Sequence, residues 1–469
     1  MREEERQNLF ENASVARAIA RLAIPTMIGQ IIGVIYNMAD TFFVGRTGSD
    51  AMLVAVTICM PAFMLLTAIS NLFGVGGASA VSRALGKRKF KRAGLCASFS
   101  FYGCLAVTLL YSLASFSLMD PFVNLLGGTH ADVHRIAKEY LTVTVVLGGA
   151  ATSMNALLAH LLRSEGRSMH AAAGVILGGL MNIVLDPLFM FILLPKGREA
   201  FGAALATALS NACALAYYAA VLLWTERKHS VLRFRMDAKA LYDGIPKEVL
   251  SVGLPAFIMT GCENISYAVM DALVAGHGLA YQAGMGVAKK VNMLAHCAVR
   301  GIAQGALPLI AYNEAARNEK RMYSAICIAA GSSVVLASVC MIISFAFSRL
   351  LIGCFIRTSP SDMYGTVYLR ILCMGCPFSA LAYTMISFFQ AVKKGRTSLI
   401  LALLRKGILD VPLLFLLNAI CPPFGLAWAT PAADVACCVV AAVCFYSYFK
   451  ESSFSQIQGF LQEVRSHVV

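Results

Sequence analysis

The segment IYNMADTFFVG, residues 35–45, decides which class of fold this sequence can adopt. It ends a long apolar run that begins near Ala18, and yet it contains the ionisable side chain of Asp40. The run is long enough for an α-helix to cross the hydrocarbon core of a bilayer, which takes roughly 20 residues. A carboxylate in that core costs about 2.5–3.5 kcal/mol on insertion scales, so it usually faces a protein interior and serves a function. The segment predicts a membrane-spanning helix with an acid that needs an explanation.

The composition of the whole chain extends this interpretation. Of 469 residues, 58% are hydrophobic and only 14% are charged, and the mean hydropathy is +0.71. A soluble protein would carry roughly 25% charged residues. Apolar runs of spanning length recur along the chain, whereas a transmembrane barrel would show short alternating segments. The sequence therefore predicts an all-α polytopic membrane protein.

The net charge of +14 and the fifteen cysteines have simple interpretations. The basic residues cluster between apolar runs, as in cytoplasmic loops, and we expect no nucleic-acid partner. Cys373 and Cys376 have redox spacing, but they lie inside a predicted span without a thioredoxin-like context. No phosphate-binding loop of Walker type is present, which argues against ATP as the energy source. We expect no cofactor.

Twelve membrane spans are predicted from the apolar windows. Their approximate ranges are 17–44, 51–82, 93–120, 138–162, 168–194, 201–225, 246–275, 282–312, 322–355, 364–391, 397–418 and 425–449. The loop after span 2, RALGKRKFKR (83–92), is strongly basic, and the other even-numbered loops are also basic. The positive-inside rule places these loops and both termini in the cytoplasm.

The chain contains an internal repeat. LAIPTMIGQ (22–30) aligns with VGLPAFIMT (252–260) at a shift of 230 residues, and FGAALAT (201–207) aligns with FGLAWAT (424–430). A duplicated unit of six spans enters the membrane twice from the same side, which predicts two parallel six-helix bundles around a central cleft. We expect an N-lobe at 1–225, a cytoplasmic linker at 226–246, a C-lobe at 247–450 and a cytoplasmic amphipathic tail at 451–469.

Several motifs resemble those of the multidrug and toxic compound extrusion (MATE) family. They occur in order along both halves: YNMADTFFVGR (36–46), GVGGASAVSRALGKRKFKRA (74–93), MNIVLDPLF (181–189), FGAALATALS (201–210), VGLPAF (252–257) and GIAQGALPLIAYN (301–313). The resemblance implies two six-helix bundles, a monomer, and export of lipophilic, often cationic drugs coupled to H⁺ or Na⁺. It implies a location in the inner (plasma) membrane and no enzymatic activity.

Four oxygen-bearing residues of the first half are candidates for a cation site. Asp40 is predicted about one turn from the outer end of span 1, and Asn182 and Asp186 share one face of span 5. Thr207 is predicted at a similar depth in span 6. Carboxylate, amide and hydroxyl oxygens suit a small hard cation such as Na⁺ and suit a proton equally well. The MATE resemblance assigns these four positions to the cation site of the N-lobe.

Some of these residues also have structural interpretations. Asp186 precedes Pro187 and could serve only the backbone freed at that kink, and Asp40 could be a helix-end residue at the headgroup level. Tyr36 and Asn37 lie about one turn from Asp40 and are predicted to complete its hydrogen bonds. Beyond a possible Na⁺ at Asp40 and Asp186, no metal is expected.

The second half is not a copy of the first, because Met270 and Phe415 stand at the counterparts of Asp40 and Asp186. Glu263 resembles an acid of the sodium-coupled branch of the family, but the acid expected in span 10 is missing. Glu263 and Asp410 form a possible polar site of the C-lobe. The alternative is a structural ion pair, of Asp410 with Lys290 or Arg300.

Pro25 and Pro255 occupy equivalent points of the two halves and are predicted to kink their spans, as static bends or as hinges. The tail, 451–469, has apolar residues at helical spacing and is predicted to lie on the cytoplasmic surface.

The sequence favours a secondary antiporter that alternates between two lobe arrangements. A lipid-linked oligosaccharide flippase of the same superfamily is the main alternative, kept open by Lys289, Lys290 and Arg300. An intramembrane enzyme lacks a recognisable catalytic constellation in the sequence.

Overall fold

The computed structural model describes residues 3–47, 49–128, 130–225, 230–232, 234, 237–356 and 360–466; the side chains of 41, 50, 224, 225, 238 and 451–466 are not described. All regular secondary structure in these ranges is helical. The predicted linker, 226–246, lies partly outside the described residues. The amphipathic side chains of the predicted tail, 451–469, lie wholly outside them.

The first half of the chain forms one bundle, which we call the N-bundle. Its helices are α1 (Glu3–Gln7), α2 (Val15–Gly45), α3 (Asp50–Gly86), α4 (Phe90–Ser117), α5 (Met119–Leu125), α6 (Ala131–Leu141), α7 (Gly149–Ser164), α8 (Ser168–Pro187) and α9 (Glu199–Ala220). π-Helical segments lie at Asn8–Asn12, Thr142–Leu147, Leu188–Leu193 and Val221–Thr225.

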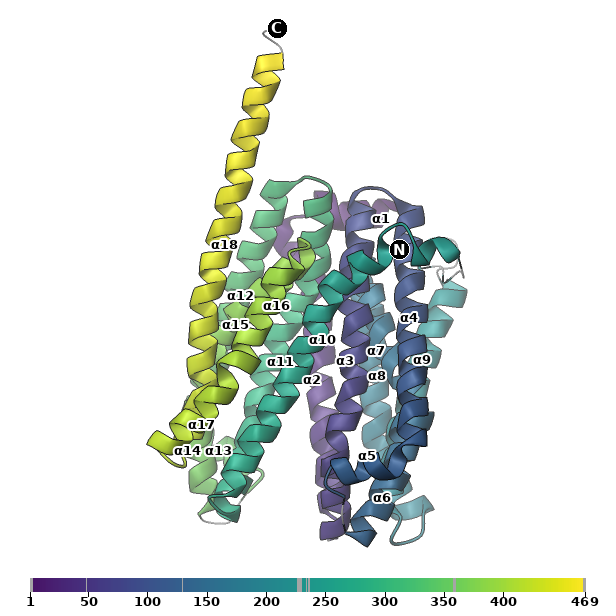
Figure 1. The fold of residues 1–469 in the computed structure, drawn as a ribbon, viewed down its shortest axis with the longest axis vertical. Coiled ribbons are helices and arrows are strands. Elements are labelled where there is room, and N and C mark those ends of the chain that lie inside the picture. The colour runs from purple at the N-terminus through teal and green to yellow at the C-terminus, as the bar shows by residue number, and fades with distance from the viewer. Residues whose placement is uncertain are drawn as a thin grey trace.

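The second half forms the C-bundle, which stands beside the N-bundle (Figure 1). Its helices are α10 (Ile245–Ala275), α11 (Leu279–Ala315), α12 (Glu319–Ala346), α13 (Ser348–Gly353), α14 (Ser361–Cys373), α15 (Cys376–Ala391), α16 (Gly395–Leu403), α17 (Asp410–Ile420) and α18 (Gly425–Ser466). A 3₁₀ turn at Ala238–Leu241 precedes α10, and a π-helical segment at Leu404–Ile408 joins α16 to α17.

Within the described residues, nine helices are long and apolar enough to cross a membrane, and two bent pairs raise the number of spans to eleven. The bent pairs are 131–147 with 149–164, at 48°, and 361–373 with 376–391, at 46°. The remaining predicted span, 397–418, is divided among α16, the π-helical segment and α17. Each of these pieces is shorter than the roughly 20 residues that one continuous span requires.

The two bundles touch through close helix crossings that only glycine permits. A Cβ on Gly253 of α10 would lie 1.7 Å from the carbonyl oxygen of Leu72 on α3, and one on Gly76 would lie 2.2 Å from that of Val249. On α11, a Cβ on Gly305 would lie 2.5 Å from Ala23 Cα of α2. These crossings bring the backbones together in the half of the molecule that contains the chain termini.

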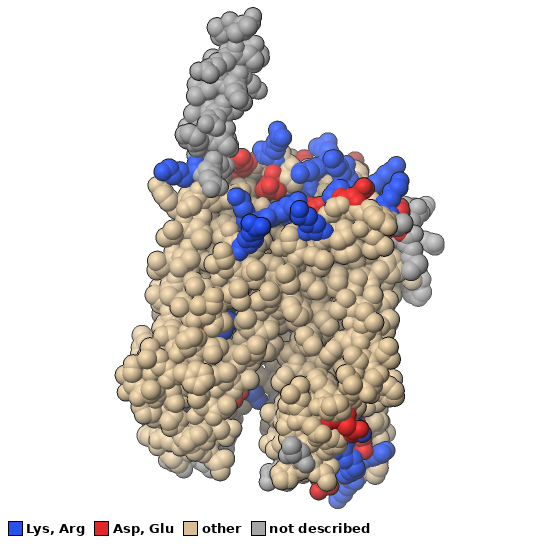
Figure 2. Space-filling model, in the orientation of Figure 1, with Lys and Arg blue, Asp and Glu red and all other residues tan. Residues whose placement is uncertain are grey.

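Charged residues add to the contact at the same end. Glu248 of α10 accepts hydrogen bonds from Arg83 of α3 (3.2 Å) and from Arg92 of α4 (2.8 Å). Figure 2 shows Lys and Arg side chains gathered at this end, above uncharged flanks. At the opposite end the surface is hollowed between the two bundles (Figure 2). The structure is therefore closed at the end with the termini and open at the other end.

Candidate functional site

Three polar side chains from neighbouring helices meet inside the N-bundle. Asn182 and Asp186 lie one turn apart on α8, and Thr207 lies on α9. The amide nitrogen of Asn182 donates to Asp186 Oδ1 (3.2 Å) and to Thr207 Oγ1 (3.4 Å). All three residues are buried. The structure thus brings these predicted site residues into one hydrogen-bonded group.

Asp40 lies beside this group on α2, which packs along α8. The charge of Asp40 is close enough to act on that of Asp186. Asp40 is buried, and its Oδ1 has no hydrogen-bond partner among the described residues; the same is true of Asp186 Oδ2 and Asn182 Oδ1. Buried oxygen atoms without donors are uncommon in proteins and suit a proton or a hard cation. We call Asp40, Asn182, Asp186 and Thr207 the N-bundle cluster.

Tyr36 and Asn37 are the two neighbours predicted to complete the hydrogen bonds of Asp40. The amide nitrogen of Asn37 donates to the carbonyl of Gly33 (2.7 Å), one turn back on its own helix. This local bond is the usual alternative for an asparagine within a helix. Tyr36 lines a cavity between the bundles. That Tyr36 and Asn37 complete the hydrogen bonds of Asp40 therefore stays a prediction.

The end of α8 explains the position of Asp186. Pro187 ends the regular helix, and a π-helical segment, Leu188–Leu193, follows. Such segments often mark functional sites because they rotate the residues around them. Asp186 Oδ1 accepts its hydrogen bond from a side chain, that of Asn182, so the carboxylate does not serve only the backbone at the proline.

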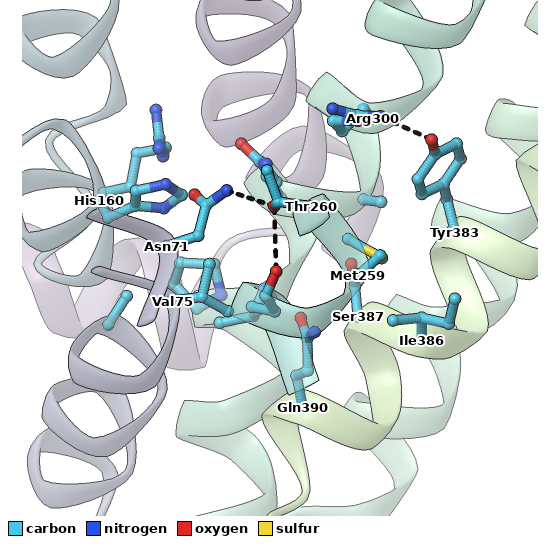
Figure 3. Close-up of a pocket in the computed structure, with 17 residues that line it drawn as sticks. Asn71, Val75, His160, Met259, Thr260, Arg300, Tyr383, Ile386, Ser387 and Gln390 are labelled. Carbon is cyan, nitrogen blue, oxygen red and sulfur yellow. Dashed lines mark hydrogen bonds between the residues drawn. The ribbon is translucent and has the colours of Figure 1, made fainter. Parts of the chain in front are cut away.

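Two adjoining cavities lie between the bundles and together form what we call the central cavity. They share five lining residues: Asn71, His160, Arg163, Arg300 and Gln304. Asn71 of α3 donates to Thr260 of α10 (3.0 Å), which joins the bundles across the cavity (Figure 3). In the same figure His160 and Arg300 lie on opposite sides of this bond.

The central cavity comes within one helical turn of two residues of the N-bundle cluster. Its lining includes Tyr36, one turn before Asp40, and Asn211, one turn after Thr207. Asn211 donates to the carbonyl of Thr207 (2.9 Å) and accepts from the side chain of Asn155 (2.8 Å). A movement in the cluster can therefore reach the cavity wall through a short chain of hydrogen bonds.

In the C-bundle, by contrast, Glu263 is fully engaged. Both of its carboxylate oxygens accept from Arg300 (2.7 and 2.9 Å), and Tyr383 donates to the same carboxylate (3.0 Å). The guanidinium of Arg405 lies 3.9 Å from the ring centroid of Tyr383 and pairs with Asp434 (2.6 Å). These residues form a neutralised network and not an open acidic site.

Asp410 also belongs to a paired group, but not with the predicted partners. Lys406, one turn earlier, donates to Asp410 Oδ2 (3.0 Å), Ser266 donates to the same atom, and Thr430 donates to Oδ1 (3.1 Å). The predicted pairing of Asp410 with Lys290 or Arg300 is wrong. Arg405 and Lys406 are both buried in the π-helical segment Leu404–Ile408. Lys406 of this segment is therefore the cation that pairs with Asp410 of the following helix, α17.

Several residues of the central cavity did not stand out in the sequence: Gln30, Asn71, Asn155, His160, Arg163, Asn211, Gln304 and Tyr383. Their common signal is a polar side chain inside an apolar span, which is a functional hypothesis by default. In the sequence this signal pointed to the carboxylates and to Tyr36, Asn37, Asn182 and Thr207, but not to these eight residues.

Pro25 and Pro255 both lie within continuous helices, α2 and α10, and both are buried. Pro25 stands between two residues of α2 that approach glycines of α11, Ala23 and Met27. Pro255 follows Gly253 by two positions. The two prolines therefore lie at the contact between the bundles.

Two helical bundles that enclose a polar cavity define a class of protein, the membrane transporters built from internal repeats. Among the described residues, no group of three or more His, Cys, Asp or Glu side chains has the geometry of a metal site.

The sequence model of the MatE family matches residues 25–188 and 255–416, once in each half. The chain therefore belongs to the MatE family, the multidrug and toxic compound extrusion transporters, and it is not an enzyme.

Relatives agree with this assignment, and solved structures have the same fold. The chain is 28% identical to the multidrug export protein MepA of Staphylococcus saprophyticus, over 93% of this chain and 95% of MepA. It is 27% identical to MepA of Staphylococcus aureus strain MRSA252, over the same shares. A crystal structure of a MATE protein in complex with MaL6 has a TM-score of 0.88 at 23% identity, and covers 96% of this chain and 99% of that one.

Proposed function

We propose that this protein is a secondary antiporter that exports lipophilic, often cationic drugs in exchange for H⁺ or Na⁺. The MepA proteins of Staphylococcus saprophyticus and Staphylococcus aureus are multidrug export proteins, which supports drug export as the function. The observation that carries the cation coupling is the N-bundle cluster. Its unpartnered oxygens belong to Asp40, Asn182 and Asp186, and Asp40 lies one helical turn beyond Tyr36, which lines the central cavity.

The pairing of acids in the C-bundle supports this choice of site. Arg300 neutralises Glu263, Lys406 neutralises Asp410, and Arg405 neutralises Asp434. A cation that bound there would have to displace an existing positive charge. Among the described residues Asp40 and Asp186 form no ion pair, although the charge of Lys290 acts on Asp40, so binding of one H⁺ or Na⁺ relieves the repulsion between the two acids.

The distribution of charge supports a plasma-membrane orientation with both termini in the cytoplasm. Exposed basic residues gather in the loops at the end with the termini, among them Lys87, Lys89 and Arg317. The hollow between the bundles is at the opposite end (Figure 2). In this orientation the structure is open to the outside, the state in which the outside cation enters and the drug leaves.

Coupling follows if the cation and the drug favour different arrangements of the bundles. Cation binding draws α2 and α8 together at Asp40 and Asp186, and the change passes to the cavity wall through Thr207, Asn211 and Asn155. The bundles then close at the outer end and open at the inner end, with Pro25 and Pro255 as hinges. The drug reloads from the cytoplasmic side.

The test is ethidium efflux from purified protein in liposomes, with pH and Na⁺ gradients imposed separately. We expect one gradient to drive efflux, which identifies the ion. Asp40→Asn should abolish gradient-driven efflux and retain ethidium binding, because it removes the charge but preserves the shape of the side chain. The matched control is Asp132→Asn, an exposed acid of α6. Unchanged, gradient-dependent efflux by Asp40→Asn would refute the mechanism.

A lipid-linked oligosaccharide flippase remains the second candidate because Arg163 and Arg300 line the central cavity. Two of the cations that suggested this function are nevertheless paired, Arg300 with Glu263 and Lys289 with Asp271. A lack of ethidium efflux under either gradient would favour the flippase.

A further inference from the structure

Residues 3–12 precede the first long helix and lie at the end of the molecule with the termini (Figure 1). They consist of α1 and the π-helical segment Asn8–Asn12, and we call them the N-terminal segment. The segment is mostly polar, yet Leu9 and Phe10 are only 2% and 0% exposed. Because isolated helices of this length are marginal in water, contacts with the rest of the protein must hold the segment in place.

The C-bundle holds the segment at the end of its helix. Arg321 of α12 donates to the carbonyl oxygens of Phe10 (2.7 Å) and Leu9 (3.3 Å), and Asn313 of α11 donates to that of Phe10 (3.3 Å). The last carbonyls of a helix lack partners in the helix itself, and a cation near them is favourable. The ring of Phe10 also stacks on that of Tyr312, with 4.9 Å between the centroids.

The N-bundle holds the same segment by other side chains. Arg6 is buried, and its guanidinium lies 5.1 Å from the ring centroid of Phe90 at the start of α4. Glu11 lies 3.7 Å from Arg88, in the loop after α3, and accepts a hydrogen bond from Tyr312 of α11 (2.6 Å). Glu11 therefore contacts a cation of one bundle and a hydroxyl group of the other.

The segment docks next to a close crossing of the two bundles. A Cβ on Gly86, the last residue of α3, would lie 2.2 Å from the carbonyl oxygen of Tyr312 and 3.2 Å from the Cβ of Ala315 on α11. Tyr312 thus takes part both in the crossing and in the docking of the segment. When the bundles separate at this end, Tyr312 moves away from α3 together with the C-bundle. The segment cannot keep its contacts with both bundles during that movement.

We propose that the N-terminal segment is a latch that holds the two bundles together at the end with the termini. It has to leave the C-bundle before that end opens, and the contacts of Phe10 and Arg321 are the ones that break. These contacts exist only in the closed arrangement, so they lower the population of the arrangement that is open at this end. The proposal goes beyond drug export, because it depends neither on the coupling ion nor on the drug.

The test measures how often the closed end opens. Ala315→Cys places a thiol at the crossing with Gly86, where a maleimide reaches it only after the bundles separate. Mass spectrometry of peptides from the purified full-length protein in detergent gives the reaction rate of this thiol apart from those of the native cysteines. This rate follows the fraction of molecules that are open. Phe10→Ala and Arg321→Gln should each raise it by at least about 10-fold, the effect of one lost hydrogen bond to a charged group.

Three controls separate opening of the bundles from loss of structure. Native Cys104, fully buried inside the N-bundle, should react no faster in either variant, whereas unfolding would expose it. Glu4→Gln changes an exposed residue of α1 and should leave the rate at position 315 unchanged. Arg321→Lys keeps a charged donor and should raise that rate less than Arg321→Gln does.

Two results would overturn the latch. Equal rates at position 315 in the wild type, Phe10→Ala and Arg321→Gln would show that the segment does not hold the bundles together. A parallel rise at Cys104 would show that the segment supports the whole fold and not the closed end alone.

Ethidium efflux in liposomes, measured on the same preparations, shows which of the two proposals fails. If the variants show the expected labelling but the wild type exports no ethidium, the proposed function fails and the latch stands. If the wild type exports ethidium and labelling at position 315 is insensitive to the segment, only the latch is wrong.

Discussion

Arg405 and Asp434 lie deep in the C-bundle, where each side chain is 1% exposed and their hydrogen bond measures 2.6 Å. Within the part of the chain that the structure describes, Asp434 Oδ2 and Arg405 Nη1 have no hydrogen-bond partner, so the pair is only partly satisfied. The N-bundle treats buried charge differently, because Asp40 and Asp186 form no ion pair with any described residue, and Lys290 acts on Asp40 only from a distance. At the scale of single residues, one half of the repeat keeps neutralised pairs and the other keeps open oxygens.

The buried pair gives a stability prediction. Arg405→Gln leaves Asp434 buried without its cation, which should lower the free energy of unfolding by about 3–5 kcal/mol. Adding Asp434→Asn removes the stranded charge and should recover most of the loss. Thermal unfolding of the purified protein in detergent measures both effects.

The control for this prediction is Lys138→Gln, which breaks the exposed pair of Lys138 with Asp120 (2.6 Å) and should change Tm little. If the double variant is no more stable than Arg405→Gln, the cost lies in lost packing against Tyr383 and not in the stranded charge.

At the scale of helices, apolar runs predicted the elements well, but the breaks inside them were missed. The predicted range 201–225 covers α9 and the following π-helical segment, and 246–275 matches α10 to within one residue. The predicted spans 138–162 and 364–391 are instead bent pairs, at Gly148 and at Met374–Gly375. Hydropathy reports how long an apolar segment is, but it does not report where neighbouring helices force a bend.

The close crossing of α3 and α10 gives a prediction at this scale. Gly253→Ala places a methyl group 1.7 Å from the carbonyl oxygen of Leu72 as the helices now stand. The bundles must separate to relieve that contact, so Tm and drug efflux should both fall. Ethidium efflux in liposomes and thermal unfolding in detergent measure the two effects.

Gly261→Ala, on the same helix, is the matched control, because nothing lies within 4 Å of its added Cβ. Alanine in place of glycine favours a helix by about 0.5–1 kcal/mol, so this variant should be as stable as the wild type or more stable. Equal behaviour of the two variants would show that the crossing of α3 and α10 does not depend on glycine.

At the scale of the whole molecule, the question is which end faces the cytoplasm. We expect Lys89→Cys, in the basic loop after α3, to react with a membrane-impermeant maleimide only after cells are permeabilised. Lys196→Cys, in the exposed segment before α9, should react in intact cells. Both belong in a background in which the exposed Cys327, Cys354 and Cys421 are serine.

The protein with these three serines but without either new cysteine supplies the baseline for this labelling. The reverse pattern would place the hollow of Figure 2 towards the cytoplasm and would make the structure an inward-open state.

The sequence by itself determined the membrane class, the duplicated plan and the helices that contain Asp40, Asn182, Asp186 and Thr207. It could do so because spanning length, repeated motifs and the i, i+4 spacing of a helix are local properties of the chain. Only the tertiary structure decided which charges are neutralised: Glu263 by Arg300, Asp410 by Lys406, and Arg163 by no described residue. Partners between helices depend on rotation and tilt, which are set by packing against neighbours and not by the composition of one span.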